Sequence, residues 1–349
     1  MSKFLVFLFS AFCLSTAAPF SNGTLLSSAN STDLCAIGNI IHPTASSSFY
    51  YPSTWRENQT APALDAAKSC SWLVTVPQGH FAKLVVSGQV SKLQLIDSAG
   101  NVDQSSNETM TPYYFTSPKF TIGLSSSNSS ATFAFKVVWA PLPTNLESNF
   151  VNYTALVKEI TANASGFSVG SGSRVSLLPV PSNPSNPVSL RSVVVFQGES
   201  TNEQYITNLY RIYQSGQQLA SIGQALTIVN LEASNSSDVL IVQNFQYTKD
   251  IHDYKGFTCS ANSTCSVQVN SGMRSSAAVS VNTNTEVLTA VRMDASASLT
   301  VYYGSTSDAC KVAQFSANKI QSLLPMSFSG NCTQYVVSSG KAYLEINRM

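Results

Sequence analysis

The chain has 349 residues, of which only 11% are charged, against about a quarter in average soluble proteins. Its 19 basic and 18 acidic residues leave a formal net charge of +1, which argues against the basic stripe that a nucleic-acid-binding surface needs. At 44% hydrophobic residues, the chain can bury the cores of two domains and is too apolar for a disordered protein. We therefore expect folded domains whose surfaces are kept soluble by uncharged polar groups.

The first residues have the layout of a secretory signal. Lys3 supplies a positive charge, residues 4–14 are mostly apolar, and small residues follow at 15–18. The apolar run is too short to span a membrane, and no later run reaches the roughly 20 apolar residues that a spanning helix needs. We predict a signal peptide at 1–17, a secreted product, and an exposed, glycosylated segment at 18–34.

Cysteine usage also indicates export. Cys13 would leave with the signal, and an even number of cysteines in an exported chain predicts disulfides. Proximity favours pairing them in sequence order, although the sequence alone does not choose among the pairings. A zinc site is the alternative, but the chain has no CxxC pair and its three histidines, at 42, 80 and 252, are scattered. The predicted disulfide cysteines are Cys35, Cys70, Cys259, Cys265, Cys310 and Cys332.

Acceptor triplets for N-glycosylation are abundant. In an exported protein several of them should carry glycans, which would place them on exposed loops and solubilise a surface poor in charge. The acceptor residues are Asn22, Asn30, Asn58, Asn107, Asn128, Asn152, Asn163, Asn235, Asn262 and Asn331.

Alternation of apolar and polar residues dominates the first part of the chain, as in β-strands with one buried face. Short strands separated by turns rich in Gly, Pro, Asn and Ser indicate an antiparallel β-sandwich. The sequence Ala-Pro-Leu-Pro that ends at Pro143 marks the end of this domain, which we place at 35–143. The alternation predicts strands at 70–76, 82–86, 92–96, 120–124 and 133–139.

The second half divides into three pieces. Residues 144–190, rich in Gly, Ser, Pro and Asn, are expected to form a connection that includes the first strand of a second domain. Strand-like runs between 192 and 303 place a second β-sandwich at 191–305. Residues 306–349 are expected to form a C-terminal extension with one disulfide. A helix is predicted at 308–324, because Asp308 can cap it, apolar residues recur at helical spacing, and Pro325 ends it.

Four sequence motifs in the first half resemble the CUB-like domain of secreted nematode proteins. They are FYYPSTWRENQT at 49–60, CSWLVTVPQG at 70–79, LQLIDSAGN at 93–101 and TPYYFTSPKF at 111–120. The likeness covers 35–143, and the similar last hairpins of the two halves suggest that the second domain is a diverged CUB-like copy. The resemblance implies an all-β fold of antiparallel, jelly-roll-like sandwiches in tandem, with a short C-terminal extension that holds one helix.

The resemblance also implies an extracellular protein without catalysis of its own. Members of the family are associated with innate immune and stress responses, and some are found with membrane rafts. Many CUB domains hold Ca²⁺ through acidic residues at one end of the sandwich. Here Asp97 and Asp103 are close in the sequence and Glu108 follows, but three oxygens would not complete a calcium shell. We expect Asp97 to be a turn residue that bonds its own backbone, and we predict no bound metal.

One catalytic pattern occurs, the sequence GFSVG at 166–170, which fits the G-x-S-x-G of hydrolases. In those enzymes the serine stands on a sharp strand-to-helix turn, whereas Gly, Ser and Pro follow Ser168 where the helix should begin. His252, flanked by Asp250 and Asp253, would be the general base or part of a small metal cluster, and a solvated loop is the simpler interpretation. We predict a protein that is not an enzyme and has no cofactor; a degenerate hydrolase remains an alternative.

Two aromatic clusters give the binding hypothesis, one of Tyr50, Tyr51 and Trp55, the other including Tyr113 and Tyr114. Aromatic rings stack on sugars and anchor protein contacts, and burial inside the sandwich is the alternative. We predict a secreted recognition glycoprotein of innate immune or stress defence that binds an extracellular protein or glycan. We expect no nucleic-acid partner and a peripheral association with membrane rafts. A structural matrix or mucus component is the alternative.

Overall fold

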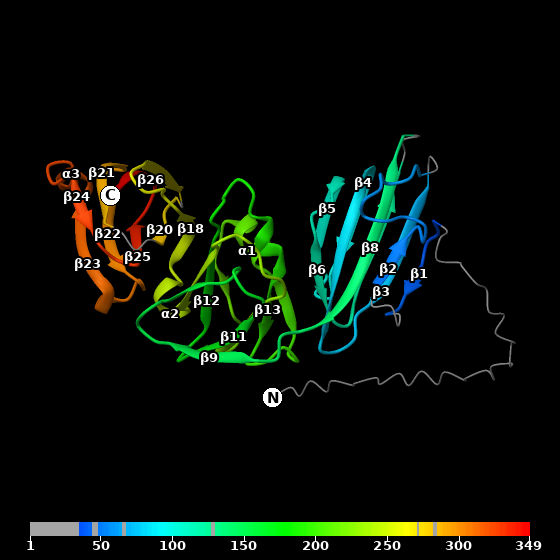
Figure 1. Cartoon of the computed structure of the whole chain (residues 1–349). Helices are drawn as coiled ribbons and strands as arrows, with labels where there is room; N and C mark the ends of the chain where they lie inside the picture. The colour runs from blue at the N-terminus through cyan, green and yellow to red at the C-terminus, as the bar shows by residue number, and fades with distance from the viewer. Residues whose placement is uncertain (1–34, 44–47, 65–67, 127–129, 271, 282–284) are drawn as a thin grey trace, which may run out of the picture. The chain divides into compact units, whose positions relative to one another are not determined.

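The computed structural model describes residues 35–43, 48–64, 68–126, 130–270, 272–281 and 285–349 (Figure 1). Its regular structure is mostly β-strand arranged in several sheets, which confirms the predicted all-β fold class. The predicted signal peptide at 1–17 and the segment at 18–34 lie outside the described residues. Among the described residues, no helix is long and apolar enough to cross a membrane.

The first sandwich is built from one eight-stranded sheet that packs around its own core. Its path runs β1-β3-β7-β4-β8-β2, and β5 and β6 both pair with β4. The core contains Trp72, Phe133 and Phe135, whose rings contact one another at centroid separations of 5.2 to 5.9 Å. The strands are β1 Asn39–Ile41, β2 Ser48–Tyr51, β3 Ser69–Thr75, β4 His80–Ile96, β5 Val102–Thr109, β6 Tyr113–Thr116, β7 Lys119–Ser125 and β8 Thr132–Pro141.

The 17-residue strand β4 joins the two strands predicted at 82–86 and 92–96. Its first half pairs with β6 and β8, and its second half pairs with β7, after a register shift between Gln89 and Leu93 in its pairing with β5. Gly88 permits the close approach of β8 there, because a Cβ atom at Gly88 would lie 2.2 Å from the carbonyl oxygen of Thr132. One strand can therefore serve both layers of the sandwich.

The middle sandwich packs a five-stranded sheet, β14-β13-β16-β11-β9, on a four-stranded sheet, β10-β17-β12-β15. Residues of both sheets share one core, and helix α1 adds Leu209 and Ile212 to it. The elements are β9 Leu146–Val151, β10 Leu156–Glu159, β11 Gly166–Ser171, β12 Val175–Val180, the 3₁₀ helix η2 Val188–Ser192, β13 Val193–Gln197, β14 Tyr205–Asn208, α1 Leu209–Ser215, β15 Leu219–Ala220, β16 Ala225–Asn230, β17 Val239–Asn244 and α2 Phe245–Thr248.

The C-terminal sandwich also has two sheets, β18-β20-β25-β22-β23 and β19-β26-β21-β24. Their facing sides bury Leu299, Tyr335 and Leu344 in one core. The elements are β18 Ile251–Phe257, β19 Thr264–Asn270, β20 Ser275–Val281, β21 Glu286–Met293, β22 Ser298–Tyr303, the 3₁₀ helix η3 Asp308–Cys310, β23 Lys311–Ser316, α3 Ala317–Ile320, β24 Met326–Phe328, β25 Cys332–Val337 and β26 Lys341–Arg348.

These sheets divide the second half differently from the sequence analysis, which places one sandwich at 191–305 between a connection and an extension. The stretch at 144–190 supplies four strands of the middle sandwich, and the stretch at 306–349 supplies four strands of the C-terminal sandwich. The Gly- and Ser-rich composition of 144–190 concealed its strands. Strand β26 is central to its sheet, so the C-terminal residues are part of a domain core.

The helix predicted at 308–324 is wrong over most of its length. Residues Lys311–Ser316 form strand β23, which pairs with β22 so that Phe315 lies opposite Leu299, and only Ala317–Ile320 are α-helical. The apolar residues of this stretch also suit a strand, and the open edge of β22 provides a partner. Tertiary pairing therefore overrides the local helical spacing.

Two of the three predicted disulfides are confirmed, Cys35 with Cys70 and Cys259 with Cys265. The third predicted pair is wrong, because Cys310 and Cys332 are both free thiols. Strand β22 lies between β23, which Cys310 directly precedes, and β25, which begins at Cys332. Two strand spacings separate such positions by about 10 Å, and a disulfide tolerates about 7 Å between Cα atoms.

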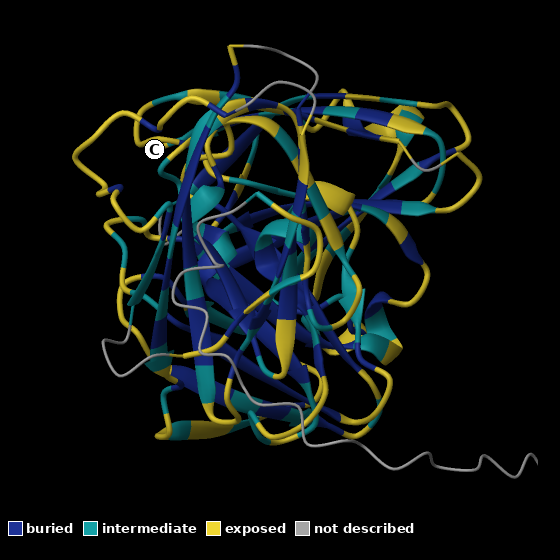
Figure 2. Cartoon of the chain, turned by 90° about the vertical axis from the view of Figure 1, so that its right-hand side faces the viewer, coloured by how far each residue is buried: buried dark blue, intermediate teal, exposed yellow. Residues whose placement is uncertain are grey.

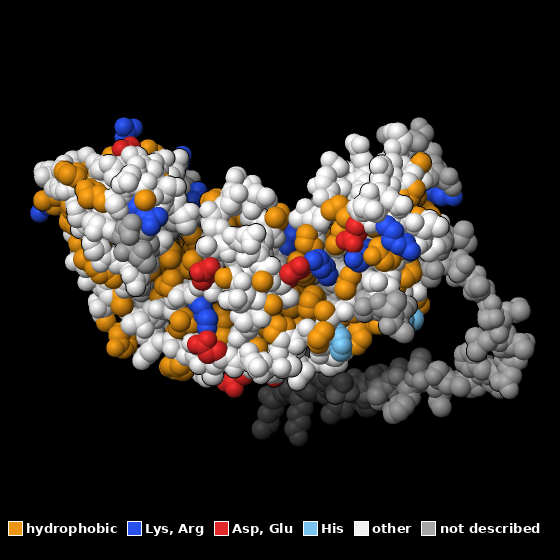
Figure 3. Space-filling model, viewed as in Figure 1, with side chains coloured by type: hydrophobic (Ala, Val, Ile, Leu, Met, Phe, Trp, Pro, Cys, Tyr) orange, Lys and Arg blue, Asp and Glu red, His pale blue; other side chains and the backbone are white. Residues whose placement is uncertain are grey.

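Burial follows the strands, with buried residues on the inner faces of the sheets and exposed residues mainly in the connecting loops (Figure 2). Charged side chains are sparse on the face drawn in Figure 3, where uncharged polar and hydrophobic groups predominate. This face therefore has the low charge density expected from the composition.

Candidate functional site

The first predicted aromatic cluster does not form an exposed patch. Tyr51 and Trp55 are 5% and 3% exposed, and the ring of Tyr51 stacks on Phe135 at 5.3 Å. Tyr50 is half-buried, with the guanidinium of Arg56 at 4.7 Å from its ring centroid. The expectation of exposed rings is wrong for Tyr51 and Trp55, because large apolar side chains on strand faces gain most by packing in the core.

The second predicted cluster is also buried, but its rings reach the middle sandwich. Tyr113 and Tyr114, in β6, are 5% and 7% exposed. The guanidinium of Arg191 lies 4.0 Å from the ring centroid of Tyr113. The hydroxyl of Tyr114 donates a hydrogen bond of 2.6 Å to Glu232. The expected exposure of this cluster is wrong as well, and its position identifies a contact between two sandwiches, which we call the first junction.

The turn between β4 and β5 supplies the acidic part of the first junction. Oδ1 of Asp97 accepts hydrogen bonds from the backbone N–H of Ala99, at 3.0 Å, and of Asn101, at 2.8 Å. The prediction that Asp97 bonds its own turn is therefore confirmed. Asn101 extends the turn toward the middle sandwich, because its side-chain amide donates to Asp97 Oδ2 and to the carbonyl oxygen of Ile206.

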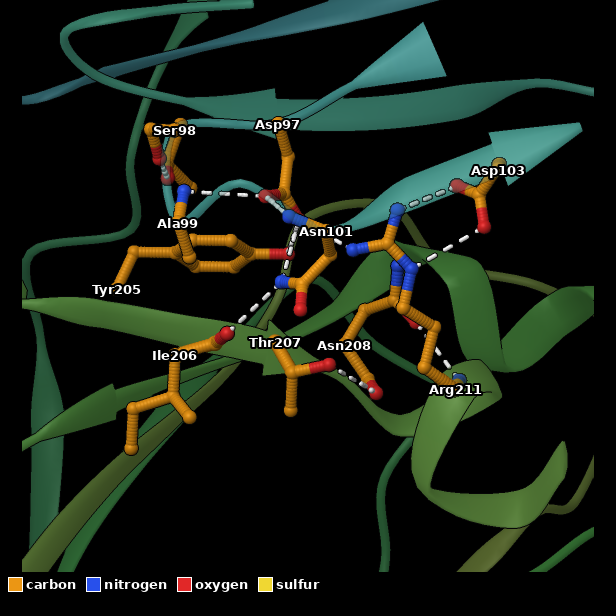
Figure 4. Close-up of polar contacts among 11 residues, drawn as sticks. Asp97, Ser98, Ala99, Asn101, Asp103, Tyr205, Ile206, Thr207, Asn208 and Arg211 are labelled. Carbon is orange, nitrogen blue, oxygen red and sulfur yellow. Dashed lines mark hydrogen bonds and ion pairs between the residues drawn. The ribbon is translucent and has the colours of Figure 1, made fainter. Parts of the chain in front are cut away.

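Arg211 of helix α1 inserts its guanidinium between the carboxylate of Asp97 in this turn and that of Asp103 at the start of β5 (Figure 4). Its Nε donates to Oδ1 of Asp103 at 3.1 Å, and its Nη2 donates to Oδ2 of the same carboxylate at 2.6 Å. Its Nη1 donates to Oδ2 of Asp97, which also accepts from the hydroxyl of Tyr205 at 3.1 Å. The side chain of Asp97 is only 2% exposed, so this ion pair is removed from water. We call these four side chains the arginine clamp.

Local structure holds the clamp in place. Asn208 caps α1 by accepting a hydrogen bond from the backbone N–H of Arg211, and Gly216 ends the helix in the left-handed conformation. Burial lowers the pKa of Arg211, but the hydrogen bond and charge of Asp103 and the charge of Asp97 outweigh it and raise that pKa overall. Burial, with the charge of Asp97, raises the pKa of the Tyr205 hydroxyl, which therefore stays a neutral donor.

The three acidic residues considered for calcium do not form one group in the structure, because Glu108 has a different partner from Asp97 and Asp103. Asp97 and Asp103 bind Arg211, whereas Glu108 accepts a hydrogen bond of 2.6 Å from the hydroxyl of Tyr113. The described residues include no group of three or more side chains that could hold a metal ion. In this chain, two of the three acidic residues of the turn region bind an arginine of the neighbouring sandwich.

A second ionic contact and an apolar cluster complete the first junction. Glu232, which follows β16, accepts 2.7 Å and 2.6 Å hydrogen bonds from Lys83 of β4 and from Tyr114. Around them, Phe81 and Leu142 of the first domain pack with Phe196 and other buried residues of the middle sandwich. Burial raises the pKa of Glu232, but the hydrogen bonds from Lys83 and Tyr114 outweigh burial and lower it overall.

The residues of the hydrolase pattern lie in a strand. Ser168 is at the centre of β11, paired with Thr227 on one side and Ser148 on the other, so it does not stand on a strand-to-helix turn. His252 lies in β18 of the C-terminal sandwich, exposed to solvent, and Asp253 accepts a hydrogen bond from the backbone N–H of Asn270. Among the described residues, no hydrogen bond joins Ser168 to a base.

The described glycosylation acceptors share one property, which is that every one of them is exposed. They lie on all three sandwiches, mostly in turns and loops. Asn22, Asn30 and Asn128 lie outside the described residues. The exposed acceptors are Asn58, Asn107, Asn152, Asn163, Asn235, Asn262 and Asn331.

Sequence reasoning did not single out the residues that make the first junction, namely Arg211, Lys83 and Glu232. None of them lies in a recognisable motif. The one available signal is the scarcity of charge, because only 11% of the residues are charged. In such a chain, an arginine or glutamate between apolar residues is a candidate for one partner of a buried ion pair.

Comparison with known proteins agrees with the resemblance of the first domain. Residues 31–143 match a family model described as a CUB-like domain, so this part of the chain is similar to CUB-like domains. Residues 152–231 and 246–349 match two further models, described as domains of unknown function, DUF7592 and DUF7591. No curated protein matches the chain.

Solved structures of low similarity include two CUB1-EGF-CUB2 fragments. The rat MASP-1 fragment is 8% identical to this chain, with a TM-score of 0.23. The match covers 59% of this chain and 99% of the fragment. The human MASP-1/3 fragment is 10% identical, with a TM-score of 0.22, and the match covers 56% of this chain and 99% of the fragment. The full extracellular region of zebrafish Gpr126/Adgrg6 is 8% identical, with 90% of this chain covering 52% of it and a TM-score of 0.25. At these TM-scores we infer nothing from the likeness.

Proposed function

We propose that the protein is a secreted, non-catalytic recognition glycoprotein that binds an extracellular protein or carbohydrate. The observation that carries this proposal is the first junction. There a CUB-like domain recognises a protein surface of its own chain, through a bidentate arginine contact and an apolar cluster. Such contacts are typical of binding modules.

Secretion and glycosylation are supported by independent features. The two disulfides fit an oxidising compartment, and the N-terminal residues have the layout of a signal peptide. The exposure of all the described acceptor asparagines makes each of them accessible to glycosylation. Glycans on these residues would compensate for the low charge of the surface.

A role in innate immune or stress defence is the finer part of the proposal. It rests on the resemblance of the four motifs between 49 and 120 to the CUB-like domain of secreted nematode proteins. The same resemblance suggests a peripheral association with membrane rafts at the cell surface. A defence protein of this kind would bind microbial surfaces or a host protein in the extracellular space.

The test uses the full chain expressed in a secreting eukaryotic cell. We expect the protein in the medium, with a mass that falls after treatment with an N-glycosidase. We expect the deglycosylated protein to bind a glycan array or whole bacteria, or to copurify with one host protein, while a secreted glycoprotein of similar size does not. Retention inside the cell, or no binding in any of these assays, would contradict the proposal.

The same preparation separates the alternatives. Self-association into material that resists extraction would favour a matrix or mucus component. Turnover of a generic ester that disappears in Ser168→Ala would favour a hydrolase. We expect a protein that stays in solution and an ester turnover equal to that of the buffer, because Ser168 lies in mid-strand.

A further inference from the structure

The outer face of one sheet of the C-terminal sandwich carries a hollow that no known activity accounts for. Strands β19, β26 and β21 are neighbours in this sheet. Tyr343 of β26 lies directly opposite Gln268 of β19 on one side and opposite Arg292 of β21 on the other. Residues directly opposite in a sheet share a face, with Cβ atoms about 5 Å apart. An aromatic ring is thus flanked by an amide and a guanidinium.

The side chains of this row point away from the core. Burial alternates along β26, where Ala342 and Leu344 are buried and Tyr343 between them is partly exposed. Gln268 and Arg292 are exposed. The hollow has a volume of about 270 Å³ and is also lined by Asp294 and Lys341. It is therefore an open platform on the surface.

The platform has unpaired positive charge. Within the part of the chain that the structure describes, neither Arg292 nor Lys341 forms an ion pair, and the guanidinium of Arg292 lies 5.8 Å from the ring centroid of Tyr343. Asp294 already serves the turn before β26, because its Oδ2 accepts from the backbone N–H of Lys341 and a Cβ atom at Gly340 would collide with it. A ligand would meet two cations, one amide and one ring face, together with the carboxylate of Asp294 and, beside the Tyr343 hydroxyl, that of Glu345.

The platform is also distant from the glycosylation acceptors of its sheet. Asn262 precedes β19, whose Thr264 pairs with Asn347, whereas Lys341 pairs with Asn270 at the opposite end of that strand. Those ends are separated by about 20 Å of extended strand. A glycan on Asn262 would therefore be attached at the end of β19 opposite to Lys341.

We propose that this platform binds a pyranose sugar that carries a carboxylate, a uronic acid residue of a polysaccharide. The apolar face of the sugar ring would stack on Tyr343, Gln268 would hydrogen-bond ring hydroxyls, and Arg292 with Lys341 would bind the carboxylate. The inference rests on the proposed non-catalytic binding function and assigns it a ligand class and a place in the C-terminal sandwich.

The experiment measures binding of a galacturonic acid trisaccharide to the full secreted chain by titration calorimetry. We expect saturable binding of this trisaccharide below about 1 mM and at least about tenfold weaker binding of the neutral galactose trisaccharide, which lacks the carboxylates. Oligoglutamate tests for charge alone, because it carries carboxylates without a pyranose face, and we expect it to bind as weakly as the neutral sugar.

Variants locate the site. We expect Tyr343→Ala to weaken binding at least about tenfold and Tyr343→Phe, which keeps the ring, to change it by less than about twofold. Arg292→Gln should weaken binding about fivefold, whereas Lys92→Gln, a matched loss of an exposed cation in the first sandwich, should leave it unchanged. The melting temperature of each variant shows that it is folded.

Three results would overturn the inference. They are an absence of trisaccharide binding by the wild type, wild-type affinity in folded Tyr343→Ala, and oligoglutamate binding as tight as that of the trisaccharide. If the wild type binds bacteria or a host protein but not the trisaccharide, only this inference fails and the proposed function stands. If it binds none of them, both fail.

Discussion

The two junctions of this protein differ in their polar chemistry. At the first junction, two ionic contacts join the first sandwich to the middle sandwich, the arginine clamp and the pair of Lys83 with Glu232. At the second junction, between the middle and C-terminal sandwiches, the buried polar groups are neutral. The hydroxyl of Tyr254 donates to Gln334, and it accepts from Gln243 at 3.2 Å. The amide of Gln334 donates to Gln243 at 2.7 Å.

The apolar parts of the two junctions are similar, so the difference lies in the polar groups. Leu178, Val180 and Ile241 of the middle sandwich pack against Tyr254 and Val279 of the C-terminal sandwich, much as the apolar cluster packs at the first junction. A buried ion pair is costly to desolvate and depends on both charges being present. A satisfied amide–phenol network carries no charge and is independent of pH near neutrality. We therefore expect the first junction to respond to charge and acid, and the second to respond to hydrogen bonding alone.

The largest effect is expected from Arg211→Met. This change leaves the carboxylate of Asp97, 2% exposed, without its cation, and breaking a buried pair by removing one partner costs about 3–5 kcal/mol. The measurement is the free energy of unfolding by urea. Adding Asp97→Asn in the same chain should recover part of the loss, because the uncompensated charge is then removed.

Glu57→Gln is the matched control, because it removes one partner of an exposed ion pair. Glu57 accepts from Lys136 at 2.6 Å, and its side chain is 39% exposed. Exposed pairs of this kind contribute at most about 1 kcal/mol. Equal losses from Arg211→Met and Glu57→Gln would show that burial does not distinguish the clamp, and the comparison of the junctions would then be wrong.

At the second junction, Tyr254→Phe should cost about 1–3 kcal/mol, because it leaves Gln334 and Gln243 each with one unsatisfied buried group. Tyr153→Phe is the control, since Tyr153 is 52% exposed and surface changes usually lie within about 0.5 kcal/mol. Both are measured by the same urea titration at pH 7. A neutral result for Tyr254→Phe would mean that water replaces the lost hydroxyl and that the network is not closed.

Much of the fold could be predicted from the sequence, because strands with one buried face repeat an apolar residue at every second position. This pattern identified β3, β7 and β8 within a residue or two. It failed where local and tertiary preferences conflict, as at Lys311–Ser316, where helical spacing gave way to pairing with β22. It also missed strands in the Gly- and Ser-rich stretch before residue 190, since small residues carry little hydrophobic signal.

The candidate site was less predictable, because it depends on contacts between distant residues. Cys259 and Cys265 are six residues apart, so their pairing followed from proximity. Arg211 and Asp97 are 114 residues apart, and neither has a sequence feature that names the other. The aromatic residues at 113 and 114 were proposed as exposed ligand-binding residues, because alternation cannot show whether a ring meets a ligand or another domain of the same chain.

The smallest expected effect is the response to acid, and it separates the junctions most directly. The pKa of Glu232 is lowered from its usual value of 4.5 in the folded protein, although burial opposes the shift, because Lys83 and Tyr114 donate to its carboxylate. The unfolded chain then binds this proton at a higher pH than the folded chain does. The contribution of Glu232 is therefore present above about pH 4.5 and is lost as the pH falls through the lowered folded pKa.

We expect Glu232→Gln to be less stable than the wild type at pH 6, and this difference to shrink as the pH falls below 4.5, in urea titrations at pH 6 and at an acidic pH. Tyr254→Phe should differ from the wild type by the same amount at both, because burial raises the pKa of Tyr254 and keeps its hydroxyl neutral. Cys332 lies in the same junction, and burial with the nearby charge of Glu286 raises its pKa to about 12. Its thiol therefore also stays neutral at both pH values. The opposite result would reverse the assignment of charge dependence to the first junction. In that result the free energy of unfolding of Tyr254→Phe would approach the wild-type value in acid, while the difference between Glu232→Gln and the wild type would not change with pH.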